Sequence, residues 1–216
     1  MAHVVAVSNL KGGTGKSSIA VNLACARATS KRRVVLIDAD AQGTASQWAA
    51  QGALPIHVEA LPLEQQRDTE RWVGRVVALR DAADLVVIDC PPHIGAATSA
   101  AFLVADLVVI PVTPSGADLL ATSKALDLLR EARTVRQDGK PACLMVPSRV
   151  DRRTGAGREI EAALKPFGEA IGPAVGQRSA FLDAFTAGHW IGQHAPTSKA
   201  YTEAAALAAA VARRLP

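Results

Sequence analysis

Long apolar runs alternate with segments of helical periodicity along this chain. Most of the strand-like runs are apolar at every position, which is typical of parallel strands buried on both faces, whereas Ile56–Val58 contains His57 at its centre. The intervening segments place apolar residues three and four positions apart, the spacing of an amphipathic helix. The strand-like runs are Val4–Val7, Val34–Ile37, Ile56–Val58, Leu85–Ile88, Leu107–Val112 and Ala142–Val146. This alternation predicts an α/β fold: a mostly parallel, twisted sheet with helices on both faces and right-handed crossovers.

Several helices follow from the same pattern. The residues from Leu63 to Leu79 predict a surface helix with Trp72, Val73, Val76 and Val77 on its apolar face. The remaining helices are expected after Lys16, over 44–51, 118–135, 155–167 and 178–188, and over 197–215 at the end. No repeat, linker or low-complexity segment interrupts residues 1–216, so we expect a single domain.

Composition excludes several classes of protein. No apolar run is long enough to span a bilayer, and a strand beginning at Val4 leaves no room for a signal peptide. Three dispersed cysteines, Cys25, Cys90 and Cys143, favour buried thiols over disulfides or a zinc site.

Charge is uneven along the chain. The net charge is +4, and residues 130–216 carry +5 while residues 1–129 carry −1. A basic C-terminal portion suggests a polyanionic partner, nucleic acid first. The solvated surface of an alkaline protein is the alternative, and charge alone does not choose between them.

The stretch from Lys11 to Ser18, Lys-Gly-Gly-Thr-Gly-Lys-Ser-Ser, lies between a predicted strand and a predicted helix. Strand, glycine-rich loop and helix form the context of a phosphate-binding loop. Its glycines let backbone N–H groups converge on phosphate oxygens, and the helix adds its positive dipole end. The residues expected to bind nucleotide are Lys11, Gly12, Gly13, Thr14, Gly15, Lys16, Ser17 and Ser18. Lys16 supplies charge to the terminal phosphates, and the Ser17 hydroxyl is placed to ligate Mg²⁺.

The loop departs from the usual pattern at its start. Leu10 stands where the usual loop has glycine, and a second lysine, Lys11, follows it. One nucleotide rarely needs two loop lysines from one subunit, so Lys11 suggests a cation offered to a neighbouring subunit's phosphates. With these features the sequence resembles the ParA/MinD family, whose signature is this deviant Walker A loop. The resemblance implies a P-loop ATPase that uses ATP and Mg²⁺ and forms a homodimer around two nucleotides.

Two further predicted strands end in aspartate. Asp38 and Asp40 follow the run ending at Ile37, and Asp89 follows the run ending at Ile88. Carboxylates at these strand ends face the ligand crevice of a parallel sheet. Asp89 is expected to hold Mg²⁺ as a Walker B residue. By resemblance, Asp40 activates the attacking water, so that Lys11, Lys16 and Asp40 are the catalytic residues, and Asp38 supports the Mg²⁺ shell. Capping of the next helix by Asp38 and Asp40 is the alternative.

The segment after Asp89 contains two prolines, Pro91 and Pro92, which fix a stiff loop. This loop resembles the family's switch beside the γ-phosphate, where a backbone N–H near Gly95 senses that phosphate. His93 is a weaker candidate for a general base, because the family assigns the water to Asp40. Residues 147–151 resemble the family's adenine-side loop only loosely, and no base contact is assigned.

The resemblance implies an ATPase that binds DNA without sequence preference and positions cargo: a plasmid, a chromosome region or a protein assembly. A cargo-bound partner protein would stimulate its slow hydrolysis, in the cytoplasm and on the nucleoid. The terminal helix has few large apolar residues, so no stable membrane association is expected. Arginine clustering gives the candidate DNA contacts, which are Arg149, Arg152, Arg153, Arg178, Arg213 and Arg214.

Other functions compete with this interpretation. A MinD-like ATPase of membrane surfaces shares the motifs but needs a more apolar terminal helix. A carrier of metal clusters would need paired cysteines, and a tyrosine kinase would need more than Tyr201. A nucleotide-dependent scaffold that does not hydrolyse ATP would not need both Lys11 and Asp40.

Overall fold

The computed structural model describes residues 2–215. Seven strands form one sheet in the order β3-β2-β4-β1-β5-β6-β7, and every pairing is parallel. The strands are β1 (His3–Val7), β2 (Val34–Asp38), β3 (His57–Ala60), β4 (Leu85–Asp89), β5 (Leu107–Val112), β6 (Ala142–Pro147) and β7 (Ala170–Ile171). The predicted α/β fold with a parallel sheet is confirmed.

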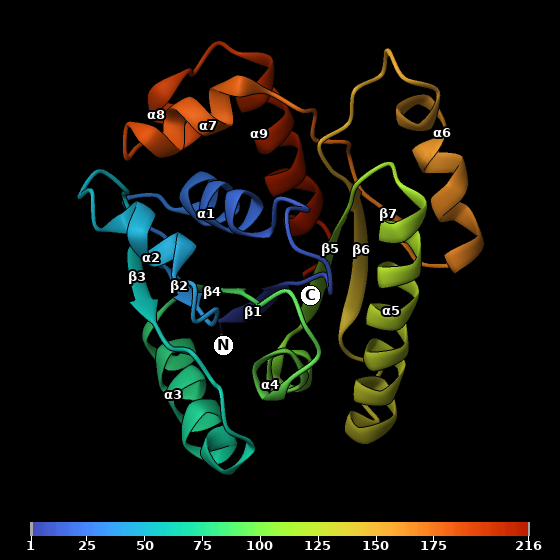
Figure 1. Cartoon of the computed structure of the whole chain (residues 1–216). Helices are drawn as coiled ribbons and strands as arrows, with labels where there is room; N and C mark the ends of the chain where they lie inside the picture. Colours follow the sequence, from blue (N-terminus) through green and yellow to red (C-terminus); the bar gives the residue numbers. More distant parts are fainter. Residues whose placement is uncertain (1, 216) are drawn as a thin grey trace.

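Helices cover both faces of this sheet (Figure 1). On one face lie α1 (Lys16–Arg27), α2 (Thr44–Ala49), α7 (Ser179–Thr186), α8 (Ile191–His194) and α9 (Lys199–Ala212). On the other lie α3 (Thr69–Ala82), α4 (Ala96–Val104), α5 (Gly116–Arg136) and α6 (Gly155–Leu164). Short 3-10 helices, η1 (Gln66–Asp68) and η2 (Lys165–Phe167), adjoin α3 and α6.

Two hydrophobic cores result from the two faces. Successive side chains of a strand point to opposite faces, so Val4 and Ala6 enter one core while Val5 and Val7 enter the other. This explains why the runs of the inner strands are apolar at every position, whereas the edge strand β3 contains His57 and Glu59. Helix α9 is part of the second core, where Leu207 and Val211 are buried. No helix within residues 2–215 has the length and hydropathy needed to cross a membrane.

The structure corrects some of the predicted elements. The helix expected from Leu63 begins at Thr69, because Leu63 lies in a loop that follows Pro62. Val77 is 46% exposed, so its assignment to the apolar face was wrong, although Trp72 and Val76 are buried. Three elements were not predicted: α4 is rich in alanine, and β7 and α8 are too short to show a period.

The strand order places the ligand crevice. From β1 the chain moves to β2 and β3 at one edge of the sheet, and from β4 it moves to β5, β6 and β7 toward the other edge. The direction of strand addition therefore reverses beside β1. In open parallel sheets, ligands bind outside the carboxyl ends of the strands at this reversal. The loops after β1, β2, β4 and β5 all meet there.

Candidate nucleotide-binding site

The loop between β1 and α1 has the backbone of a phosphate cradle. Gly13 and Gly15 adopt positive φ of 76° and 88°, which a side chain would disfavour. A Cβ on Gly15 would also lie 3.1 Å from the Ser148 Oγ. No side chain caps the amino end of α1, and its first turn contains no acidic residue. The amides and positive dipole of α1 therefore remain available to an anion.

The two loop lysines lie in different environments. Lys16 is buried, and its Nζ donates a hydrogen bond to the Lys11 carbonyl oxygen at 3.0 Å. Burial lowers the pKa of Lys16, although the nearby carboxylates of Asp89 and Asp40 oppose this shift. The Lys11 side chain is 41% exposed and lies at the rim of the loop. Only Lys11 is therefore placed to extend away from its own subunit.

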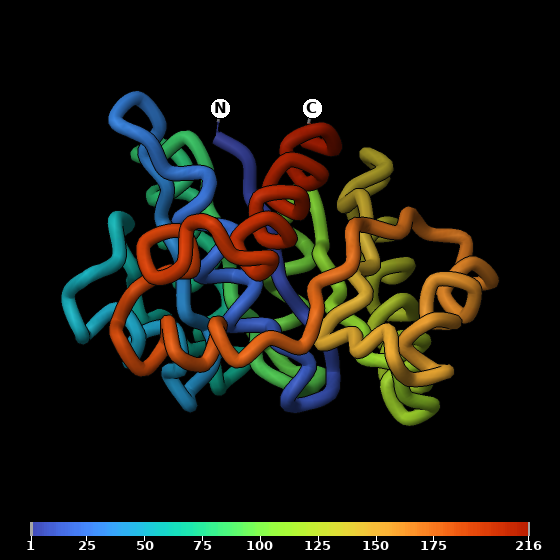
Figure 2. Tube along the Cα trace, turned by 90° about the horizontal axis from the view of Figure 1, so that it is seen from above, coloured from blue at the N-terminus to red at the C-terminus, as the bar shows by residue number. Residues whose placement is uncertain are grey.

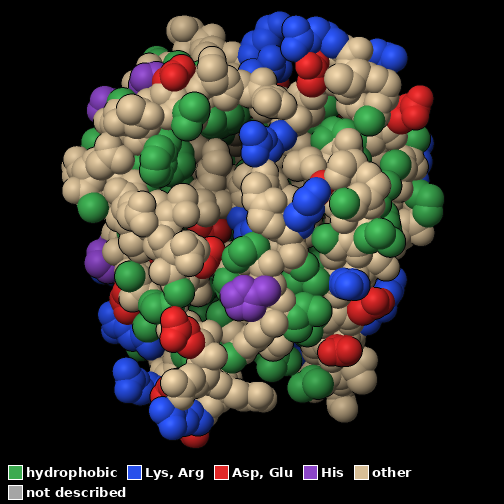
Figure 3. Space-filling view, in the orientation of Figure 1, with side chains coloured by type: hydrophobic (Ala, Val, Ile, Leu, Met, Phe, Trp, Pro, Cys, Tyr) green, Lys and Arg blue, Asp and Glu red, His purple; other side chains and the backbone are tan. Residues whose placement is uncertain are grey.

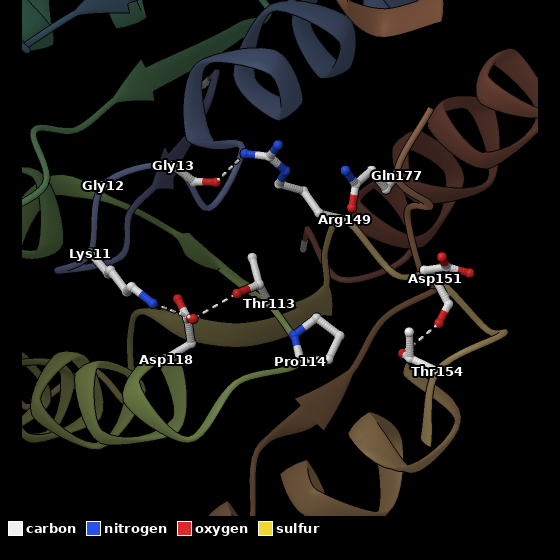
Figure 4. Close-up of a pocket in the computed structure, with 10 residues that line it drawn as sticks. All are labelled: Lys11, Gly12, Gly13, Thr113, Pro114, Asp118, Arg149, Asp151, Thr154 and Gln177. Carbon is white, nitrogen blue, oxygen red and sulfur yellow. Dashed lines mark hydrogen bonds and ion pairs between the residues drawn. The ribbon is translucent and has the colours of Figure 1, made fainter. Parts of the chain in front are cut away.

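Lys11 forms an ion pair with a residue that the sequence analysis did not single out. Its Nζ lies 2.7 Å from Oδ2 of Asp118, in the first turn of α5 (Figure 4). Thr113 Oγ1 donates to the same oxygen at 2.6 Å, and the Ser115 hydroxyl also contacts it. Burial would raise the pKa of Asp118, but the hydrogen bonds from Lys11, Ser115 and Thr113 hold that pKa below its usual value.

Asp38 and Asp89 lie side by side because β2 and β4 pair in that register. Both side chains are buried, and neither carboxylate oxygen of Asp89 accepts a hydrogen bond from a described residue. Burial and then the Asp38 charge raise the pKa of Asp89 to about 7, against the influence of Ser17 and Lys16. The two buried oxygens of Asp89, which lie beside the Ser17 hydroxyl, are the kind of ligand that Mg²⁺ prefers.

Asp38 has a second role in the fold. Its Oδ2 accepts the Ser46 amide of α2 at 2.7 Å, so the alternative interpretation as a helix cap is confirmed for Asp38. Asp40 lies in the loop between β2 and α2, where its Oδ1 accepts the Gln42 amide at 3.0 Å. Asp40 therefore belongs to a compact turn whose position depends on β2 and on α2.

The loop after β4 forms part of the same edge. Pro91 is buried, whereas His93 and Ile94 are exposed. Thr98 Oγ1 donates to the His93 carbonyl oxygen at 2.9 Å, which holds the loop against the start of α4. Within residues 2–215, no group of three or more His, Cys, Asp or Glu side chains is arranged to hold a metal ion.

Two cavities adjoin the phosphate loop. The first, of about 330 Å³, contains Lys11, Asp118, Thr113 and Arg149 on its walls (Figure 4). The second, of about 300 Å³, runs along the start of α1 and has an apolar lining. Its apolar residues are Ile19, Trp48, Val175, Phe181, Leu182 and Phe185.

The segment after β6 separates these cavities and contacts the phosphate loop directly. Ser148 Oγ donates to the Thr14 carbonyl oxygen at 2.7 Å, and Arg149 Nη1 donates to the Gly13 carbonyl oxygen at 2.9 Å. Arg149 adopts a φ of 52°, which is uncommon for a residue with a side chain. Position at the carboxyl end of a parallel strand was the signal that could have identified Ser148.

The six candidate DNA-binding arginines fall into two groups. Arg152, Arg153 and Arg178 line a cavity of about 760 Å³ with Lys199, and Arg149 precedes them and is bonded to the phosphate loop at Gly13. Basic side chains gather at the top of Figure 3, above the segment between β6 and α6. Three of these arginines pair with acidic residues: Arg152 with Glu161, Arg153 with Asp151 and Arg178 with Glu203.

Arg213 and Arg214 lie elsewhere. They follow α9 at the end of the chain, and Arg214 lies near Cys143 at the beginning of β6. Figure 2 shows both chain ends on one side of the molecule, at the amino ends of the strands. The tertiary structure therefore does not bring the six arginines into one surface.

Comparison with known proteins agrees with this geometry. Residues 5–186 match the family model of the CobQ/CobB/MinD/ParA nucleotide binding domain. The carboxysome distribution protein A of Halothiobacillus neapolitanus is 30% identical over 87% of this chain and 85% of its own length. The chromosome-partitioning ATPase Soj of Thermus thermophilus is 32% identical over 90% of this chain and 89% of its own length.

Solved structures share the fold. An ATP complex of a McdA variant from Cyanothece superposes with a TM-score of 0.78 and 16% identity, over 99% of this chain and 96% of that one. MinD from Pyrococcus horikoshii in complex with Mg-ADP gives a TM-score of 0.76 and 19% identity, over 98% of this chain and 96% of that one.

Proposed function

Because the chain belongs to the CobQ/CobB/MinD/ParA family of nucleotide-binding domains, we propose that it is a Mg²⁺-dependent ATPase that dimerises around ATP and positions cargo on DNA. The contrast between the two loop lysines is the observation that supports this most directly. Lys16 is buried within the loop, and Lys11 is partly exposed at its rim, where its ammonium contacts Asp118 and, at 3.4 Å, the Ser115 hydroxyl.

Different residues of the site have different roles in the proposed hydrolysis of ATP. The loop amides and the amino end of α1 hold the phosphates, and Lys16 neutralises their charge. Ser17 and Asp89 would hold Mg²⁺, and Asp38 would support the shell around it. Mg²⁺ supplies charge neutralisation on the transferred phosphoryl group. Asp40 orients the attacking water as general base.

The apolar cavity beside α1 is the place for the adenine base. It begins at Gly15 and Ser18, directly beyond the phosphate cradle. Phe181 and Phe185 offer stacking surfaces in its wall, and the buried Trp48 packs edge-on against Phe185. Ser148 is engaged with Thr14, whereas Gln177 also lines the cavity and offers a polar side chain to the base.

Dimerisation brings Lys11 to the partner's phosphates. Lys11 must first leave Asp118, since one ammonium cannot satisfy both sites. Two aliphatic side chains on this edge, Ile94 and Leu120, are 56% and 71% exposed. A second copy of the chain facing this edge would cover them.

Cargo positioning is the biological role that the relatives suggest, because one is named for carboxysome distribution and one for chromosome partitioning. The dimer binds DNA through arginine–phosphate contacts at the candidate residues. A partner on the cargo stimulates hydrolysis and thereby releases the ATPase from the nucleoid. We place the protein in the cytoplasm, without stable membrane association.

The test measures phosphate release and molecular mass by light scattering, each with ATP, ADP or no nucleotide, in the presence of Mg²⁺. Wild-type protein should hydrolyse ATP slowly and double its mass only with ATP. Lys16→Ala should lose ATP binding, whereas Lys11→Ala should bind ATP as a monomer. A wild-type protein without Mg²⁺-dependent hydrolysis would refute the enzyme, and an ATP-bound dimer of Lys11→Ala would refute the trans role.

A further inference from the structure

Helix α2, which follows the Asp40 turn, is too short to hold its own position. It has six residues, fewer than an isolated helix needs in water, so tertiary contacts must place it. Its amino end is held by the bond from the Ser46 amide to Asp38. The other end depends on Trp48, which is only 2% exposed.

Trp48 connects α2 to a distant part of the chain. Its indole N–H donates to the His189 carbonyl oxygen at 3.0 Å, and its ring meets Phe185 edge-on at a centroid distance of 5.2 Å. Gln51 adds a bond from its Nε2 to the Phe185 carbonyl oxygen at 3.1 Å. The carboxyl end of α2 is therefore fixed to the turn between α7 and α8.

The same ring lines the apolar cavity proposed for the base. Phe181 and Phe185 of α7 form that wall together with Trp48. A ligand that fills the cavity therefore packs against Phe185, which holds the residue that determines where α2 lies. The Asp40 turn is bonded to α2, since Gln47 Nε2 donates to the Gln42 carbonyl oxygen at 2.9 Å.

We infer that Trp48 is a positioning residue that couples occupancy of the apolar cavity by the nucleotide base to the placement of Asp40. This inference rests on the proposed function, in which Asp40 orients the attacking water. A base in the cavity packs against Phe181 and Phe185, and Phe185 holds the buried indole edge-on, so that an occupied cavity restricts α2. The Asp40 carboxylate then keeps the position that a water needs for in-line attack, and small displacements there are costly in rate.

The chain offers a matched control. Trp72 is also buried, at 3% exposure, and its indole N–H donates to a backbone carbonyl, that of Leu61, at 2.8 Å. Trp72 lies on α3, on the opposite face of the sheet. Trp48→Phe and Trp72→Phe thus remove the same donor and keep an aromatic ring, and only the first touches α2.

The experiment compares kcat and KM for ATP in wild type, Trp48→Phe and Trp72→Phe. Trp48→Phe should lower kcat by about tenfold or more while KM stays within about twofold. Trp72→Phe should leave both constants near those of wild type. Equal constants for the two variants, or a kcat loss matched by lost folded fraction in circular dichroism, would overturn the inference.

Two further measurements test the coupling itself. Ribose 5-triphosphate, which lacks the base, should lower kcat in wild type but not lower it further in Trp48→Phe. The second measurement is tryptophan fluorescence of the double variant Trp72→Phe/Trp190→Phe, in which Trp48 is the single indole. Its emission should change with ATP but not with inorganic triphosphate. Equal kcat for both substrates in wild type, or an emission unchanged by ATP, would refute the coupling. A wild type that never hydrolyses ATP would instead refute the proposed function, whatever the variants do.

Discussion

The Lys11 ammonium lies 2.7 Å from the Asp118 carboxylate, although the two residues are 107 positions apart in the sequence. Asp118 is buried and also bonded to Thr113, whereas Lys11 remains partly exposed. The carboxylate is thus the fixed partner and the lysine the mobile one. Any reaction that uses Lys11 on another subunit begins by breaking this pair.

Asp118→Asn should make dimerisation easier. Removing the negative charge weakens the hold on Lys11 by roughly 1 kcal/mol, so the ATP concentration at half-dimerisation should fall about fivefold. Asp127→Asn is the control, because Asp127 lies on the same helix and pairs only with Arg130 at the surface. Light scattering across an ATP titration measures the midpoint. A midpoint that rises in Asp118→Asn would show that the pair supports the dimer.

Asp40→Ala should separate binding from hydrolysis. The turn around Asp40 is held by backbone bonds and by α2, so the variant should fold, bind ATP and dimerise. Loss of a general base should lower kcat by about a hundredfold or more. Single-turnover phosphate release, together with light scattering, measures the two effects. Hydrolysis at the wild-type rate would exclude Asp40 as the residue that orients the water.

The two arginine groups should differ in how their DNA binding depends on ATP. Arg152 and Arg153 follow the carboxyl end of β6, on the edge through which the proposed dimer would form, so dimerisation would bring two sets together. Arg213 and Arg214 follow α9 at the opposite edge, where Arg214 lies near Cys143 at the beginning of β6. Fluorescence anisotropy of a nonspecific duplex across a salt series measures both the affinity and its slope.

Arg152→Ala/Arg153→Ala should lose the ATP-dependent affinity and lower the salt slope by about 0.9 for each phosphate contact removed. Arg213→Ala/Arg214→Ala should leave the ATP-dependent part unchanged. The opposite pattern would move the DNA surface to the amino ends of the strands. No binding in any nucleotide state would remove DNA as the track.

Two buried aspartates should give opposite pH dependences of stability. Asp89 has a pKa of about 7, above its unfolded value of 3.8, so the folded state holds the proton longer. The free energy of unfolding of the nucleotide-free protein should therefore fall as pH rises from about 4 to about 7. Asp89→Asn should remove this fall, which raises stability at pH 8 by on the order of 4 kcal/mol, and should abolish Mg²⁺-dependent hydrolysis.

Asp106 is the counterpart. Burial would raise its pKa, but Lys140 at 2.7 Å, the Val4 amide and Arg80 hold that pKa below 3.8. Its contribution to stability is complete above the unfolded value and disappears as pH falls below it. Asp106→Asn should therefore be destabilised at pH 8. Urea unfolding at pH 3, pH 5 and pH 8 measures both variants, and a stability of Asp89→Asn that declines with pH as in wild type would contradict the assignment.

Local features of the sequence determined much of this protein. The apolar runs predicted β1, β2, β4, β5 and β6, since a strand buried on both faces needs an apolar residue at each position. The short run Ile56–Val58 predicted β3, which is a partly exposed edge strand. The spacing of Lys11, Gly15 and Lys16 between a strand and a helix predicted the phosphate loop, because that chemistry is complete within one short segment. Asp38 and Asp89 could be placed at one edge because both end parallel strands.

Only the tertiary structure decided which distant residues meet. Lys11 pairs with Asp118 and Trp48 with His189 across separations of 107 and 141 residues, and no local period records such contacts. The same limit applies to the arginines, which are equivalent by side-chain type but lie on two edges of the sheet. Their placement depends on where α6 and α9 begin and end, and packing against the rest of the fold sets this.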